Sequence, residues 1–129
     1  MDDDEIIREV ATEILEHLGY ETVACSDGKE AIKIYQNALA SDSPFAAVIM
    51  DLTIPGGMGG REAIKKLQEI DNNVVGIVSS GYCNDPILAD YSEFGFSGIV
   101  EKPYSMEKLG KVLHELLYSG KENSSLLAN

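Results

Sequence analysis

Apolar residues along this chain follow two alternating patterns, one with the spacing of helices and one with the short runs of strands. Spacing near 3.6 residues predicts helices over residues 4–18, 27–39, 61–70, 84–95 and 105–118. Short apolar runs predict strands over residues 22–25, 45–51, 74–80 and 98–101. Because strands and helices alternate with short loops, we expect a doubly wound parallel sheet with helices on both faces.

The most informative run covers residues 46–50, which are all apolar, and it ends on Asp51. A continuous run of this kind is typical of a strand buried on both faces. Pro55 and the glycines behind it stop the strand. We therefore expect Asp51 at the carboxyl end of a central strand, where open α/β sheets bind their ligands.

Two polar residues are expected to begin helices. Asp27, with Glu30 three residues later, has the form of a reciprocal capping box. Ser105 is expected to cap the last helix in the same way.

Composition then limits the classes of function. A length of 129 residues suits one domain, which we place at residues 1–118, with a polar tail over residues 119–129. The net charge of −12 argues against direct binding of nucleic acid, which needs a basic patch. No apolar segment is long enough to span a membrane, and the N-terminus is acidic where a signal peptide would be basic, so we expect a cytoplasmic location. Cys25 and Cys83 form no metal or redox motif.

Charged and hydroxyl residues stand at the ends of the predicted strands. Asp51 ends one strand, Ser80 ends the next, Lys102 follows the last, and Asp2 and Asp3 precede the first helix. Clustered carboxylates repel one another and raise each other's pKa, and a hard cation such as Mg²⁺ relieves that repulsion. A carboxylate held by Mg²⁺ opposite a lysine can attack a phosphoryl group and form an aspartyl phosphate.

The order and spacing of these pieces resemble the receiver domain of bacterial two-component response regulators, over about residues 1–118. The matching pieces are Asp2-Asp3, Asp51 followed by Pro55, Ser80-Gly81, and Lys102-Pro103. Within that family the chain is most similar to receivers attached to hybrid sensor histidine kinases. The resemblance implies a flavodoxin-like fold with strand order 2-1-3-4-5, for which the chemotaxis receiver is a known example.

The resemblance also implies a role for each residue of the set. Asp51 would be the phosphoacceptor, Lys102 would contact the phosphoryl group, and Ser80 would be the switch hydroxyl. The Mg²⁺ ligands would be Asp3, Asp51 and the backbone carbonyl of Thr53, with Asp2 acting through a water or holding the site open.

The implied function is a phosphoacceptor switch of a two-component system or phosphorelay, rather than a turnover enzyme. Its phosphoryl group would come from a phosphohistidine on a sensor histidine kinase or a histidine phosphotransfer protein, and its partner surface would lie on residues 84–95, 98–101 and 105–118. Two alternatives stay open. One is a phosphorylation-incompetent binding scaffold. The other is an aspartyl-phosphate phosphatase of the haloacid dehalogenase type, which carries a second Asp where this chain has Thr53.

Three departures from the family pattern qualify this interpretation. Receivers have an apolar strand before the acidic pair, whereas this sequence begins at the pair, so we expect a four-stranded sheet with two exposed edges. Such edges favour pairing of residues 21–26 with 46–51, or pairing with a second copy in a homodimer. The loop 56–60 is one residue longer than is common. Ile99 stands where an aromatic residue, which acts as a rotamer switch, is common in the family. We therefore expect coupling between the phosphorylation site and the partner surface to run through Ser80, the backbone and the helix 84–95.

Overall fold

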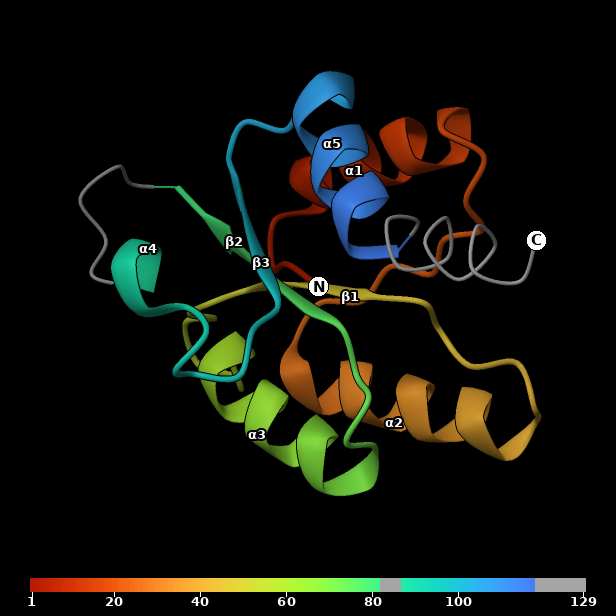
Figure 1. Cartoon of the computed structure of the whole chain (residues 1–129). Helices are drawn as coiled ribbons and strands as arrows, with labels where there is room; N and C mark the ends of the chain where they lie inside the picture. The colour runs from red at the N-terminus through yellow and green to blue at the C-terminus, as the bar shows by residue number, and fades with distance from the viewer. Residues whose placement is uncertain (82–86, 118–129) are drawn as a thin grey trace, which may run out of the picture.

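The computed structural model describes residues 1–81 and 87–117, which form three layers with a parallel sheet in the middle (Figure 1). The helices are α1 (Glu5–His17), α2 (Gly28–Ala40), α3 (Gly60–Ile70), α4 (Ile87–Asp90) and α5 (Met106–Leu117). The strands are β1 (Val48–Asp51), β2 (Gly76–Ser80) and β3 (Gly98–Glu101). The predicted polar tail over residues 119–129 and the predicted start of the helix 84–95 lie outside the described residues.

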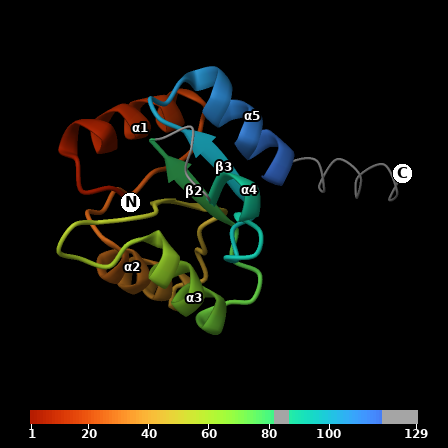
Figure 2. The ribbon, with the colours of Figure 1, turned by 90° about the vertical axis from the view of Figure 1, so that its left-hand side faces the viewer.

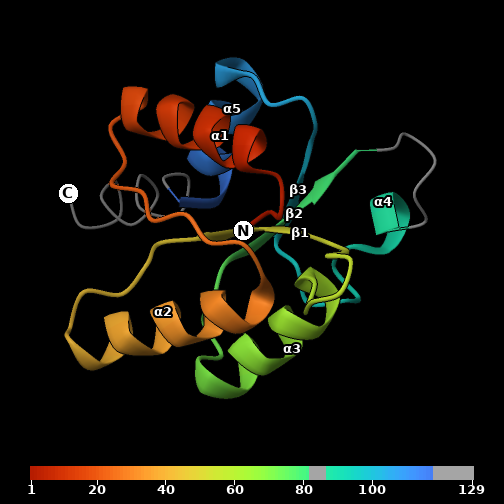
Figure 3. The ribbon, with the colours of Figure 1, turned by 180° about the vertical axis from the view of Figure 1, so that it is seen from behind.

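The layers follow from the alternation of side chains along the strands. Helices α2 and α3 cover one face of the sheet, and α1 and α5 cover the other (Figures 2 and 3). On the first face the fully buried Met50 and Val78 pack in one cluster with Ile64 of α3. On the second face Ile77 packs with Leu109 of α5. Every residue of β2 is buried, as expected for the middle strand of a sheet that is covered on both faces.

The strands pair in the order β1-β2-β3, and both pairs are parallel. This order corresponds to the last three strands of the predicted order 2-1-3-4-5. The doubly wound α/β class predicted from the alternating pattern is therefore confirmed.

The predicted number of four strands is wrong. Residues 22–25 do not form a strand, and the sheet of the described residues has three strands. Residues 21–26 do not pair directly with 46–51 either, because the first two residues of the chain lie between them. The Asp2 N–H donates to the Cys25 carbonyl at 3.1 Å, and the Asp51 N–H donates to the Met1 carbonyl at 2.9 Å. A strand needs a continuous partner, and these two residues are too few to supply one.

Helix α1 shows the consequence for packing. Its apolar residues keep the helical period, yet none of them is buried, and Ile6 is 70% exposed. The helix contacts α5, and its half-buried Ile14 and Leu15 pack against the cluster around Ile77 and Leu109. The described residues contain no helix long and apolar enough to cross a membrane.

The predicted helix starts are largely correct. The Asp27 carboxylate accepts from the Glu30 N–H at 2.9 Å, and the Ser105 hydroxyl oxygen accepts from the Lys108 N–H at 3.1 Å. The reciprocal half of the capping box is replaced, because the Glu30 carboxylate accepts from the Ser26 hydroxyl at 3.0 Å. Helix α4 is shorter than predicted, because it ends at Asp90. Residues 91–95 form turns instead, and the last of them, Gly95, has a φ of +101°.

Two glycines allow the packing to be tested with changes of opposite sign. A Cβ on Gly28 would lie 2.9 Å from Ala63 Cβ and 2.9 Å from the Met58 carbonyl oxygen, so Gly28→Ala should destabilise the fold by roughly 1–3 kcal/mol. A Cβ on Gly110 of α5 would make ordinary contacts with Leu18, so Gly110→Ala should stabilise it by roughly 0.5–1 kcal/mol. Urea denaturation measures the change in the free energy of unfolding for both variants. Equal effects from the two variants would show that the contact between α2 and the loop before α3 is looser than described.

Candidate functional site

The site is built where the strands end. Parallel register pairs Asp51 with Ser79 and Ser80 with Glu101, so the carboxyl ends of all three strands lie at one edge of the sheet. The Lys102 N–H donates to the Ser80 carbonyl at 2.8 Å, which continues the ladder by one residue and fixes where the lysine side chain starts.

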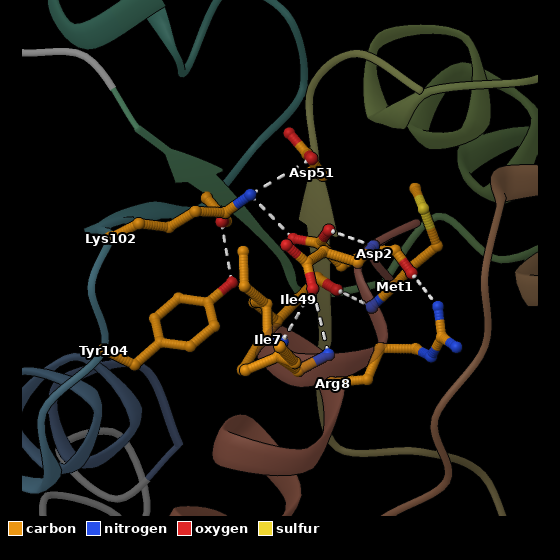
Figure 4. A network of polar contacts seen from close by, with 11 residues as sticks. Met1, Asp2, Ile7, Arg8, Ile49, Asp51, Lys102 and Tyr104 are labelled. Atoms are coloured by element: carbon orange, nitrogen blue, oxygen red, sulfur yellow. Dashed lines mark hydrogen bonds and ion pairs between the residues drawn. The ribbon is translucent and has the colours of Figure 1, made fainter. Parts of the chain in front are cut away.

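The Lys102 ammonium group lies between two carboxylates (Figure 4). Its Nζ donates to Asp51 Oδ2 at 3.1 Å and forms an ion pair with Asp2 Oδ2 at 2.6 Å. The side chains of Asp2, Lys102 and Asp51 are 5%, 16% and 19% exposed, so water screens this contact far less than it would a surface pair. Three predicted site residues are therefore in direct contact.

Asp2 is held by its backbone as well as by its charge. Its N–H bonds to Cys25, and its carbonyl accepts from Arg8 at 2.8 Å. Its Oδ1 accepts from the Asp4 N–H at 3.0 Å, in the turn that leads into α1. Asp4 itself caps α1 by accepting from the Ile6 and Ile7 N–H groups.

The pKa values of the three groups shift because they are buried together. Burial raises the pKa of Asp51, and the Asp2 charge raises it further, so it stays raised although Lys102 opposes the shift. Burial also pushes the pKa of Asp2 upwards, but the close Lys102 ammonium and the Asp4 N–H outweigh it, and the pKa of Asp2 is lowered. Burial pushes the pKa of Lys102 down, yet the two carboxylates outweigh it and raise that pKa.

Oxygen atoms that could hold a hard cation gather at the same place. One carboxylate oxygen each from Asp2, Asp3 and Asp51 can be chosen so that all lie within 4.8 Å of one another. Asp2 Oδ2 is buried and pairs with the Lys102 ammonium at 2.6 Å. Clustered carboxylate oxygens are the kind of ligand set that fits Mg²⁺.

The other two predicted residues lie beside this set. Ser80 is buried at the end of β2, next to Lys102 in the ladder. Thr53 is exposed, two residues beyond Asp51, and its N–H hydrogen-bonds the Asp51 carboxylate and favours the charged form. The switch hydroxyl of Ser80 and the Thr53 carbonyl ligand stay predictions.

Sequence reasoning missed three features around the site. The Tyr104 hydroxyl donates to the buried Ser79 Oγ at 2.7 Å. Tyr104 follows Lys102 and Pro103 in the sequence, and these two residues are joined by a cis peptide bond. An aromatic residue after Lys-Pro was the available signal. The Met1 ammonium group donates to the Ile49 carbonyl at 2.7 Å, a contact that no pattern in the sequence indicates. A Cβ on Gly60 would lie 2.8 Å from the Asp51 carbonyl oxygen, so this glycine lets α3 begin against the strand that carries Asp51.

Comparison with known proteins places this geometry in a family. The family model of the response regulator receiver domain matches residues 1–114 of this chain. The chain belongs to the response regulator receiver family. Receiver domains act as phosphoacceptor switches in two-component systems and interact with histidine kinases or phosphotransfer proteins, so the predicted family and its coarse signalling role are confirmed.

Individual relatives agree with this assignment. The chain is 28% identical to two-component response regulator 24 of Arabidopsis thaliana over 90% of its own length and 80% of that protein. It is 26% identical to sporulation initiation phosphotransferase F of Bacillus subtilis over 91% of its own length and 90% of that protein. The crystal structure of the receiver domain of sensor histidine kinase PA1611 from Pseudomonas aeruginosa, with magnesium in its active-site cleft, is similar in fold. That match has a TM-score of 0.78 at 18% identity and covers 91% of this chain and 93% of that one.

The contact between Lys102 and the carboxylates can be tested in this receiver by a double-mutant cycle. Lys102→Met leaves Asp2 and Asp51 buried without a cation and should cost roughly 2–4 kcal/mol of stability in the absence of divalent metal. Adding Asp2→Asn should recover a large part of that loss, because it removes the uncompensated charge. Lys66→Met is the matched control, since its contact with Glu62 is exposed and long, at 3.9 Å, and it should change stability by less than about 0.5 kcal/mol. Additive effects of Lys102→Met and Asp2→Asn would refute the coupling.

Proposed function

We propose that Asp51 accepts a phosphoryl group from a phosphohistidine, with Mg²⁺ bound by the acidic cluster, and that this receiver switches its partner surface in response. The observation that carries the proposal is the contact of one ammonium group, Lys102, with both Asp51 and Asp2 at the carboxyl edge of the sheet. A strand-end carboxylate can act as the nucleophile, and a lysine beside it can offset negative charge on the transferred group.

The transfer makes one bond and breaks one. A carboxylate oxygen of Asp51 attacks phosphorus, the phosphorus–nitrogen bond breaks, and its electron pair stays on the imidazole nitrogen, which takes up a proton from solvent. Lys102 Nζ, already 3.1 Å from the Asp51 carboxylate, is placed to interact with a phosphoryl oxygen as negative charge shifts in the transition state. Bound Mg²⁺ would neutralise further charge on the phosphoryl oxygens.

The surrounding residues position these groups. Asp3, Asp51 and the Thr53 carbonyl would bind the metal directly, and Asp2 would hold the site open or bind through water. Ser80, next to Lys102 in the ladder, would hydrogen-bond the phosphoryl group and transmit its presence to β3 and α4. Ile99 packs in the apolar core, so an aromatic switch at that position has no place in the proposal.

Phosphorylation is tested by intact mass after incubation with Mg²⁺ and a small phosphodonor such as acetyl phosphate. We expect one phosphate adduct on this chain and none on Asp51→Asn. Asp42→Asn makes the same chemical change in the loop before β1, at a φ of 60° that Asn tolerates, and it should still accept phosphate. Folded protein that takes up no phosphate would contradict the proposal and favour the alternative of a phosphorylation-incompetent scaffold.

Metal binding is tested separately, by titration calorimetry with Mg²⁺ alone. Asp3→Asn removes a proposed ligand, and we expect the affinity to fall by at least ten- to hundredfold, the range seen when supporting residues of metal sites are removed. Glu9→Gln, on α1 outside the cluster, is the matched control and should leave the affinity unchanged. Equal affinities for Asp3→Asn and Glu9→Gln would exclude the acidic cluster as the magnesium site.

A further inference from the structure

The Tyr104 hydroxyl is a polar group at the border of an apolar layer. The Tyr104 ring packs against the cluster around Ile77 and Leu109, between the sheet and α5. Its hydroxyl donates to Ser79 Oγ at 2.7 Å, and Ser79 is only 1% exposed. A phenylalanine ring would fill the same apolar space, so the packing of this layer does not account for the hydroxyl.

Ser79, which accepts this hydrogen bond, stands beside the phosphoacceptor. Parallel register pairs it with Asp51 of β1. Paired residues of neighbouring strands turn their side chains to the same face of the sheet, and successive residues alternate between the faces. The side chains of Ser79 and Asp51 therefore share the face that carries Ile77, and Ser80 turns to the opposite face. The Tyr104 hydroxyl is thus bonded to the side chain next to Asp51.

The segment that carries Lys102 is attached to β2 at two successive residues. The Lys102 N–H donates to the Ser80 carbonyl at 2.8 Å, and the Tyr104 side chain, two residues later, bonds to Ser79. Strand β3 ends at Glu101, so the second attachment is made by a side chain instead of by the ladder. Together the two bonds fix the position and the direction of the backbone from which the Lys102 side chain starts.

The electrostatic surroundings of Tyr104 show how near it lies to the charged site. Burial is the largest cause of its raised pKa, and the Ser79 hydrogen bond and the Lys102 charge oppose that rise. The charges of Asp2 and Asp51 raise the pKa of Tyr104 further, so the hydroxyl lies within electrostatic reach of all three charged groups. In Figure 4 the Tyr104 ring lies below Lys102, with its hydroxyl turned towards the end of β2.

Lys102 needs such support because its side chain is a flexible four-carbon stem. Its ammonium group contacts Asp2 at 2.6 Å and Asp51 at 3.1 Å at the same time, which only a narrow range of backbone positions allows. A misplacement of about 1 Å in a reacting group can cost on the order of a hundredfold in rate.

We propose that Tyr104 is a positioning residue for phosphoryl transfer, because its bond to Ser79 holds residues 102–104 so that the Lys102 ammonium lies between the two carboxylates. This inference rests on the proposed function, since it assigns Tyr104 a part in the same reaction. Tyr104 acts through Lys102 and is not itself a catalytic residue.

The first test compares two variants that each lose one tyrosine hydroxyl. Tyr104→Phe removes the bond to Ser79. Tyr35→Phe is the matched control, because the 3% exposed Tyr35 of α2 donates to Asp71 Oδ2 at the same distance of 2.7 Å, under the other face of the sheet. We expect both variants to lower the urea midpoint. Only Tyr104→Phe should slow phosphorylation by acetyl phosphate at saturating Mg²⁺, by about tenfold.

A double-mutant cycle tests whether the two hydroxyl groups act as a pair. Ser79→Ala removes the acceptor of the bond, and we expect it to slow phosphorylation about as much as Tyr104→Phe does. The double variant should be no slower than either single variant, because the same hydrogen bond is lost in all three.

A spectroscopic test observes Lys102 directly, without phosphodonor or metal. The two ε-methylene protons of a lysine give separate NMR signals when the side chain is held in one conformation, and the signals merge when rotamers interchange rapidly. We expect separate Lys102 signals in the parent chain and in Tyr35→Phe, and converging signals in Tyr104→Phe. A tyrosine with a purely structural role would leave these signals unchanged.

Three results would overturn the inference. The first is phosphorylation of Tyr104→Phe at the rate of the parent chain, or an equal loss of rate in Tyr35→Phe. The second is additive loss of rate for Ser79→Ala and Tyr104→Phe. The third is an unchanged pair of Lys102 signals in Tyr104→Phe. A parent chain that takes up no phosphate would contradict the proposed function instead, and the Lys102 signals would then decide whether Tyr104 positions the lysine.

Discussion

The contact of the Lys102 ammonium with the Asp2 and Asp51 carboxylates is the interaction on which the rest of this site depends. It brings together three segments that are far apart in sequence, and only a parallel sheet ends such segments at one edge. Register is equally important, because a shift of one residue along β1 would turn Asp51 to the opposite face of the sheet. The three charges also set one another's pKa, so none of them can be understood as an isolated group.

Much of this arrangement could be predicted from the sequence because it follows from local patterns. An apolar run that stops on a carboxylate locates both the strand and its end, and Asp51 is found there. Lys102 could be placed beside it because the last strand is short and is followed at once by Lys-Pro. The helix caps at Asp27 and Ser105 depend on neighbouring residues only, and both were predicted correctly.

The features that could not be predicted depend on contacts between distant segments. Residues 22–25 have the composition of a strand, but a strand exists only if a partner lies beside it, and here the neighbour is two residues long. The apolar period of α1 predicts the helix correctly, but it does not predict that none of its residues is fully buried. The bond between Tyr104 and Ser79 joins residues on two different elements, and neither residue type specifies the other.

Asp2 connects the open sheet edge with the charged site. Its backbone bonds to the Cys25 carbonyl beside β1, while its carboxylate, on the same residue, pairs with Lys102. Tyr104 makes a second connection, because it packs against the apolar cluster of Ile77 and Leu109 and also donates to Ser79, the residue next to Ser80. A shift of the backbone at either Asp2 or Tyr104 would therefore move a group at or beside the charged site.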